Sequence, residues 1–249
     1  MTTTDMKASG APDTRTDHHR HEHHRDVRGG AARAAVFGVS DGLLTNVSLI
    51  LGVAGANPAP GVVRLAGLAG LVAGAFSMAA GEYVSMSAQS ELVQRELAVE
   101  RRELKRNPIG EERELAEVYE QRGVPAAEAR RVAAAIMTDP EVALEVHARE
   151  ELGVDPRDTG SPRAAALSSF VSFSLGALVP LVPWFITSGV VATVASVVLG
   201  AIAAVSIGWV LALFTGRSRM RGALRQLLVA AVAAAVTYGV GTLVGRTGL

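Results

Sequence analysis

Charged residues are nearly absent from four long stretches of this chain of 249 residues. These stretches are residues 34–56, 65–88, 164–216 and 226–245. The first two contain one charged residue each, Asp41 and Glu82, and the last two contain none. A helix that crosses the hydrocarbon layer of a bilayer needs about 20 apolar residues, so the four stretches have room for one, one, two and one crossings. The sequence therefore predicts an all-α membrane protein with five transmembrane helices.

The stretch from 164 to 216 must turn once if it holds two helices. Pro183 and Trp184 mark the turn, because proline interrupts helices and tryptophan favours the boundary between membrane and water. We expect helices near 164–183 and 190–214.

Basic residues predict the orientation, since short loops rich in Lys and Arg stay in the cytoplasm. Such loops precede the first span and join the fourth span to the fifth, where Arg217, Arg219, Arg221 and Arg225 cluster. The N-terminus and residues 89–163 are then cytoplasmic, and the C-terminus lies outside. A composition rich in Ala and Arg, with no apolar leader at the N-terminus, favours a bacterial inner membrane.

The polar residues 1–33 are expected to form a disordered cytoplasmic tail. Five of the six histidines of the chain lie between His18 and His24. Such a tract either binds transition metals weakly or has no metal role, and both interpretations stay open. The chain has no cysteine, which excludes disulfides and thiolate metal sites. Any metal must therefore be bound by oxygen, nitrogen or thioether ligands.

An acidic insert, residues 89–158, separates the predicted spans in 34–88 from those in 159–249. It holds 17 of the 24 Asp and Glu residues but only 11 Lys and Arg, and so uneven a charge suggests cation binding. No proline follows Gly61 before Pro108, so the second span should continue as one helix to about Arg106. Three further helices should follow, separated by the sequences Asn107-Pro108, Gly123-Val124-Pro125 and Asp139-Pro140, and the last should end at Gly153.

Asp41 is the acid inside the first predicted span. An unpaired charge within a membrane is costly, so such acids usually mark a proton or ion path. The alternative is a protonated Asp41 that is hydrogen-bonded to Ser40 or Asn46. Gly38 and Gly42, four residues apart, would allow another helix to approach closely.

Met78 in the second span should lie at nearly the depth of Asp41, because the two spans run in opposite directions. A carboxylate and a thioether at one depth could bind Fe(II) or Mn(II), although a lone methionine is more often part of a core. Glu82, one turn nearer the cytoplasm, is interpreted as a ligand at the entrance, a proton carrier or a solvated carboxylate.

Glutamates recur on neighbouring faces of the first two insert helices. They are Glu96, Glu100 and Glu103 on the first helix, and Glu111 and Glu114 on the second. Converging carboxylates repel one another unless a cation lies between them, but an exposed charged face gives the same pattern. On the last insert helix, His147 and Glu151 are four residues apart and could add a nitrogen and an oxygen ligand.

Four short sequences carry a resemblance to a known family: Gly-Val-Ser-Asp-Gly-Leu at 38–43, Phe-Ser-Met-Ala-Ala-Gly-Glu-Tyr at 76–83, Glu-Glu-Leu-Gly at 150–153 and Pro-Leu-Val-Pro at 180–183. Together they resemble the vacuolar iron transporter family, which includes the yeast calcium-cross-complementer type. The resemblance covers roughly residues 28–246, and the long insert is similar to that of the plant vacuolar members.

This resemblance implies a homodimer of five-helix subunits that exchanges cytoplasmic Fe(II), and often Mn(II), for protons. It implies that Asp41 and Met78 line the translocation path between subunits. It also implies a cytoplasmic metal-binding domain, whose glutamates map to Glu100, Glu103, Glu111, Glu114 and Glu151.

The chain departs from the plant members at two places. Gly70 stands where they carry an acid in the second span, so either Glu82 substitutes for that acid or the path holds one carboxylate fewer. His147 and Ala148 stand where they carry methionines, which would make the cytoplasmic site harder and more sensitive to pH. Mn(II) becomes more plausible as a second substrate.

The leading hypothesis is a transporter that exports Fe(II) or Mn(II) from the cytoplasm in exchange for protons, for metal detoxification. The predicted metal ligands are Asp41, Met78, Glu82, Glu100, Glu103, Glu111, Glu114, His147 and Glu151. The expected partners are metal ions, protons, the lipid bilayer and a second copy of the chain, with no nucleic acid, no prosthetic group and no enzymatic activity.

Two rival hypotheses belong to other classes. A membrane-anchored metal sensor or buffer would bind metal on the insert and transport nothing. An intramembrane enzyme is suggested only by the pair Asp41-Gly42, which faintly resembles the CDP-alcohol phosphotransferases. Those enzymes need several further acids, and none occurs here between Asp41 and Glu82.

Overall fold

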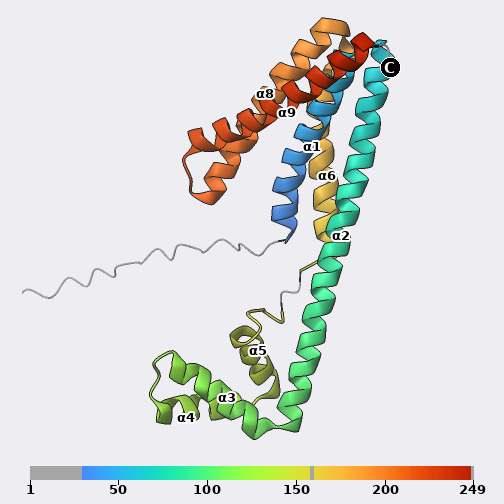
Figure 1. The fold of residues 1–249 in the computed structure, drawn as a ribbon. Coiled ribbons are helices and arrows are strands. Elements are labelled where there is room, and N and C mark those ends of the chain that lie inside the picture. The colour runs from blue at the N-terminus through green and yellow to red at the C-terminus, as the bar shows by residue number, and fades with distance from the viewer. Residues whose placement is uncertain (1–29, 158–159, 248–249) are drawn as a thin grey trace, which may run out of the picture.

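The computed structural model describes residues 30–157 and 160–247, and all regular elements within these ranges are helices (Figure 1). They are α1 (Gly30–Gly55), α2 (Pro60–Arg106), α3 (Pro108–Gln121), α4 (Ala126–Ile136), α5 (Pro140–Glu150), α6 (Pro162–Leu181), α7 (Pro183–Ile186), α8 (Gly189–Thr215) and α9 (Arg219–Thr247). Five of these described helices, α1, α2, α6, α8 and α9, are long and apolar enough to cross a membrane. The predicted number of spans is confirmed.

The predicted His-rich tail, residues 1–33, lies outside the described residues except at its end. The described chain begins at Gly30, and residues 30–33 are helical. The first helix therefore starts four residues before the predicted boundary.

Helix α2 runs the length of the molecule, with α1 and α6 along one half and α3 to α5 around the other end (Figure 1). Pro60 starts the helix, because proline at the first helical position needs no N–H partner. The helix then continues without a break to Arg106, as predicted. Asn107 ends it and caps α3, since its side chain accepts a hydrogen bond of 3.2 Å from the Gly110 N–H. A single helix thus connects the membrane bundle to the insert.

Two apolar clusters hold the insert together. Leu115 and Ala116 of α3 pack against alanines of α4, and Leu97 of α2 packs against Leu144 and Ala148 of α5. The insert therefore has a small core of its own, and α5 lies directly on α2.

The end of α5 differs from the prediction. The helix ends at Glu150, and not at Gly153. Gly153 adopts a positive φ of 65°, which turns the chain, and the Val154 N–H then donates to the Ala148 carbonyl at 3.2 Å. Gly153 is the last residue of the Glu-Glu-Leu-Gly sequence, but the helical hydrogen bonding of α5 stops before it.

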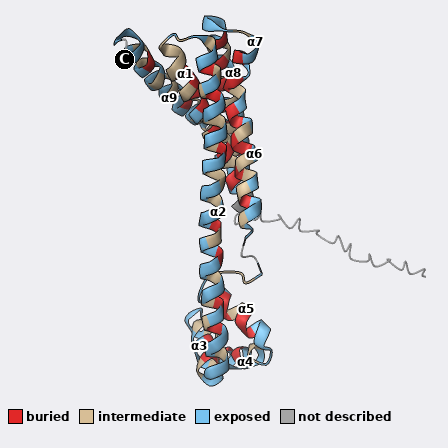
Figure 2. Ribbon diagram, turned by 90° about the vertical axis from the view of Figure 1, so that its right-hand side faces the viewer, coloured by how far each residue is buried: buried red, intermediate tan, exposed pale blue. Residues whose placement is uncertain are grey.

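The membrane bundle buries small residues and exposes large ones. The buried face of α8 consists of residues at intervals of four: Ala192, Ser196, Gly200, Ala204, Gly208 and Ala212. Large apolar residues of the same helix, such as Val198 and Ile202, are half exposed. Lipid is as apolar as Leu, so helices in a bilayer associate by close backbone packing through small residues. Figure 2 shows the buried residues along the inner faces of the bundle.

Helices α1 and α6 approach most closely at glycines. A Cβ on Gly42 would overlap the Phe173 carbonyl, and one on Gly176 would overlap the Val39 carbonyl. The close approach predicted from Gly38 and Gly42 is therefore confirmed, with α6 as the neighbouring helix.

The turn between the third and fourth spans contains an additional short helix, α7. Pro183 starts it, and Trp184 is buried against the apolar cluster that includes Ile50 and Leu181. The two flanking spans end and begin at Leu181 and Gly189, close to the predicted positions.

Candidate metal site

Four side chains of the insert meet at one point. Ligand atoms of Glu100, Glu111, His147 and Glu151 all lie within 4.8 Å of one another. His147 Nδ1 lies 3.0 Å from Glu151 Oε1, 3.3 Å from Glu100 Oε1 and 3.9 Å from Glu111 Oε2. These four residues, here called the insert cluster, are the only group of three or more potential ligands of the His, Cys, Asp or Glu type that the described part of the chain brings together.

Three different helices supply the insert cluster. Leu97 and Leu144 pack together one turn before Glu100 and His147, which fixes α5 against α2. The turn at Asn107 reverses the chain, so that Glu111 in the first turn of α3 returns to Glu100. The predicted convergence of α2 and α3 follows from this turn.

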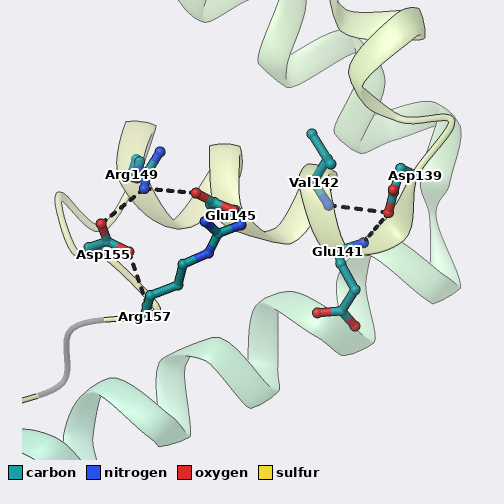
Figure 3. A network of polar contacts seen from close by, with 7 residues as sticks. All are labelled: Asp139, Glu141, Val142, Glu145, Arg149, Asp155 and Arg157. Atoms are coloured by element: carbon teal, nitrogen blue, oxygen red, sulfur yellow. Dashed lines mark hydrogen bonds and ion pairs between the residues drawn. The ribbon is translucent and has the colours of Figure 1, made fainter.

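The loop after α5 is fixed by ion pairs. Arg149 contacts Glu145 at 2.7 Å and Asp155 at 2.9 Å, and Arg157 contacts Glu145 at 2.6 Å (Figure 3). At the other end of the helix, the Asp139 carboxylate accepts a hydrogen bond of 2.9 Å from the Glu141 N–H and caps α5. Because both ends of α5 are held, the orientation of His147 and Glu151 is set by the fold.

The insert cluster is closed on most sides. The His147 side chain is fully buried, Glu100 and Glu111 are almost buried, and the Glu151 side chain is 28% exposed. His147 Nε2 and Glu100 Oε1 are buried without a hydrogen-bond partner. Buried polar atoms normally have partners, so unpaired ones suggest a ligand that supplies the missing interaction. Glu151 lies on the side that faces water, where an ion would enter.

Burial and mutual repulsion perturb the carboxylates. Burial, followed by repulsion from the nearby Glu151, raises the pKa of Glu100 from 4.5 to about 7, although His147 acts in the opposite direction. Burial and the neighbouring Glu114 also raise the pKa of Glu111. Near neutral pH the metal-free cluster therefore holds carboxylates that resist ionisation, and a divalent cation would favour the ionised form.

The structure separates the predicted insert ligands into two groups. Glu100, Glu111, His147 and Glu151 converge, whereas Glu103 and Glu114 are exposed and do not belong to the insert cluster. Both exposed glutamates still lie close enough to raise the pKa of Glu111. The sequence pattern gave His147 a minor role, but it lies at the centre. Its signal was its apolar neighbours, Leu144 and Ala148, which place it on the buried face of α5.

Asp41 lies half buried on α1, away from the insert cluster. Its carboxylate is hydrogen-bonded to Thr45, one turn along the helix. The two partners named in the alternative interpretation do not bond to it: the Asn46 side chain donates to the Ala177 carbonyl at 2.6 Å, and Ser40 Oγ has no partner among the described residues. Thr45 is the partner of Asp41 because residues four apart on a helix lie on the same face.

Met78 and Glu82 lie on the same half of α2. Met78 packs against the apolar cluster of Ala75, Phe173 and Ala177. Glu82 faces Arg33 of α1 at 3.8 Å, although one of its oxygens is buried without a hydrogen bond. This pair was not predicted from the sequence. Because α1 and α2 run in opposite directions, Arg33 and Glu82 lie at the same level of the bundle.

Comparison with known proteins matches most of the chain. The model of the VIT family matches residues 32–242. The chain is 34% identical over 224 residues to "Vacuolar iron transporter 1" of Eucalyptus grandis, covering 90% of this chain and 89% of that protein. It is 38% identical over 231 residues to "Vacuolar iron transporter" of Acanthamoeba castellanii, with 89% and 82% covered, and 32% identical over 226 residues to "Vacuolar iron transporter 1" of Arabidopsis thaliana, with 90% of both covered. With its five apolar helices, this multi-pass membrane protein belongs to the VIT family.

Proposed function

We propose that this protein transports divalent transition metal, Fe(II) with Mn(II) as a second substrate, in exchange for protons. The observation that carries the proposal is the insert cluster, in which a fully buried imidazole meets three carboxylates. The relatives are named as iron transporters, which supports metal transport over an enzymatic activity.

The chemistry of the insert cluster suits these ions. Carboxylate oxygens are hard ligands and imidazole is intermediate, a combination that suits Mn(II) and Fe(II) and lacks the soft thiolates that Cu(I) prefers. The ionised carboxylates of the cluster repel one another when no cation lies between them, so a divalent cation relieves that repulsion on binding. The insert would thus capture metal at low concentration.

Asp41 and Met78 are proposed to carry the ion across the membrane, at the contact between two copies of the chain. Protons on the outer side would protonate Asp41 and release the metal, whereas the ionised carboxylate facing the cytoplasm would bind it. Glu82 would lie at the cytoplasmic entrance, where its carboxylate faces the Arg33 guanidinium at 3.8 Å. The N-terminus and the insert are then cytoplasmic, and the metal leaves the cytoplasm.

Metal and proton fluxes in proteoliposomes test this proposal. Vesicles loaded with a pH dye and a metal-sensitive dye should show Mn(II) movement with opposite proton movement. Asp41→Asn should abolish both fluxes and leave Mn(II) binding on the insert intact, while the exposed Glu117→Gln serves as the matched control. Unchanged flux in Asp41→Asn would refute the mechanism, and binding without any flux in the wild type would support a membrane-anchored buffer instead.

A further inference from the structure

The turn between α8 and α9 encloses a hollow of about 480 Å³ that the proposed metal path does not use. Its lining includes Thr215, Arg217, Ser218, Arg221 and Arg225. Three guanidinium groups and the Ser218 hydroxyl therefore face one space as hydrogen-bond donors, whereas the Thr215 hydroxyl donates to the Leu211 carbonyl at 3.0 Å.

The arginines of this hollow form no ion pair within the described part of the chain. No Asp or Glu occurs in the sequence after Asp158, so neither α8 nor α9 carries an acid. An anion is the complementary ligand.

The fold itself shapes the hollow. Helices α8 and α9 cross closely where Gly208 meets Gly222, since a Cβ on Gly222 would lie 2.6 Å from the Gly208 carbonyl oxygen. Gly216, with a φ of 65°, ends α8 and turns the chain toward α9. Arg221 and Arg225 are four residues apart and share one face of α9, so both reach the same space.

The hollow lies where two helices long and apolar enough to cross a membrane, α8 and α9, are joined, and such a junction is expected near the lipid headgroups. Arg219, which is not part of the lining, lies over the Trp209 ring at 5.7 Å from its centre. Tryptophan concentrates at the boundary between membrane and water, which agrees with this depth.

We propose that this hollow binds the phosphate of an anionic phospholipid. Guanidinium groups match phosphate oxygens with paired hydrogen bonds, and basic pockets between transmembrane helices suit anionic headgroups. The N-terminus of α9 adds free backbone N–H groups beside the arginines. The surrounding bilayer supplies the lipid, whose acyl chains would lie along the apolar outer faces of α8 and α9.

Native mass spectrometry on the full-length, delipidated protein in neutral detergent tests the proposal. Phosphatidylglycerol should bind in preference to phosphatidylcholine. In the double variant Arg221→Gln/Arg225→Gln, its affinity should fall roughly 25-fold, because each arginine near an anionic headgroup contributes about fivefold. Arg219→Gln, which removes a neighbouring positive charge outside the hollow, is the matched control and should change the affinity less than about twofold.

A second variant separates charge from folding. Arg221→Lys/Arg225→Lys keeps both charges and should bind phosphatidylglycerol more tightly than the Gln variant. Equal lipid affinity of the wild type and the Gln variant would overturn the proposal, as would an equal loss in Arg219→Gln. Equally tight binding of phosphatidylcholine would also overturn it, and tight binding of inorganic phosphate with no preference for the lipid would assign the hollow to a soluble anion.

Discussion

Replacing Glu100 by Gln should stabilise the metal-free insert at about pH 8 and remove its stabilisation by Mn(II). The buried carboxylate of Glu100 faces Glu111 and Glu151, and the sum of burial and repulsion raises its pKa from 4.5 to about 7. A pKa raised by folding means that stability is fully present below the unfolded pKa and is lost as the pH rises toward 7. Gln has the same shape and no charge, so it escapes this loss.

The magnitude follows from the pKa. Raising it from 4.5 to about 7 corresponds to roughly 3 kcal/mol at about 1.36 kcal/mol per pKa unit. The open side at Glu151 lets water screen the charges, which reduces the expected gain to on the order of 1–2 kcal/mol. Local opening of α5 should then be about tenfold rarer in the variant.

Hydrogen exchange of the α5 peptide in the full-length protein measures this opening directly. Without metal at about pH 8, exchange should be about tenfold slower in Glu100→Gln than in the wild type, and the two should converge at about pH 4. With Mn(II), the wild type should gain protection and the variant should not. Glu103→Gln, an exposed acid one turn away, is the control and should leave exchange within about twofold. Faster exchange in metal-free Glu100→Gln would refute the reasoning, because the Glu100 carboxylate would then stabilise the insert through its contact with His147.

Three further predictions concern metal affinity and packing. The affinity of the wild-type insert for Mn(II) should fall roughly thirtyfold between about pH 7.5 and 5.5, since a proton competes for the Glu100 carboxylate below its pKa of about 7. Calorimetry at several pH values would measure this affinity, and an affinity that does not change with pH would contradict the raised pKa. His147→Gln should raise the KM for transport and keep the maximal rate, because the membrane path is intact, and a loss of maximal rate with unchanged KM would place His147 in the path. Gly42→Leu should lower the free energy of unfolding by about 3 kcal/mol or prevent folding, since its side chain would overlap the Phe173 carbonyl. The control is Gly239→Leu, because a Cβ at Gly239 meets nothing within 4 Å. Thermal unfolding in detergent compares the two variants, and equal stability would contradict the close approach of α1 and α6.

The arrangement of the helices could be predicted from the sequence because membranes impose simple rules. Stretches that hold at most one charged residue and are long enough to cross a bilayer predict spans, and the lack of proline between Gly61 and Pro108 allowed the length of α2 to be predicted. The end of α5 was placed three residues too late, since a terminal glycine does not say where helical hydrogen bonding stops. Helix α7 was missed because four residues between two spans are too few for a periodic pattern.

The candidate site was only partly predictable. Spacing placed glutamates on the facing sides of α2 and α3, but it could not distinguish Glu100 and Glu111, which converge, from Glu103 and Glu114, which remain exposed. That distinction depends on how far α3 rotates about its own axis after the Asn107 turn. The central position of His147 likewise depends on the packing of α5 against α2, a contact between distant parts of the sequence.

Helix α2 carries both Met78 and Glu100, which lie about 33 Å apart at a rise of 1.5 Å per residue. Charges this far apart are screened, because the Debye length at physiological salt is about 8 Å. Asp41 lies near the level of Met78, because its neighbour Gly42 packs on Phe173 and Met78 packs against the cluster that contains Phe173. Ionisation of Asp41 therefore cannot alter the insert cluster electrostatically, and the two ends can be coupled only by movement of the ion or of the whole helix. If the ion moves and the helix does not, Asp41→Asn should abolish transport and change the Mn(II) affinity of the insert less than about twofold. A larger change in affinity would mean that α2 moves as a rigid rod during transport.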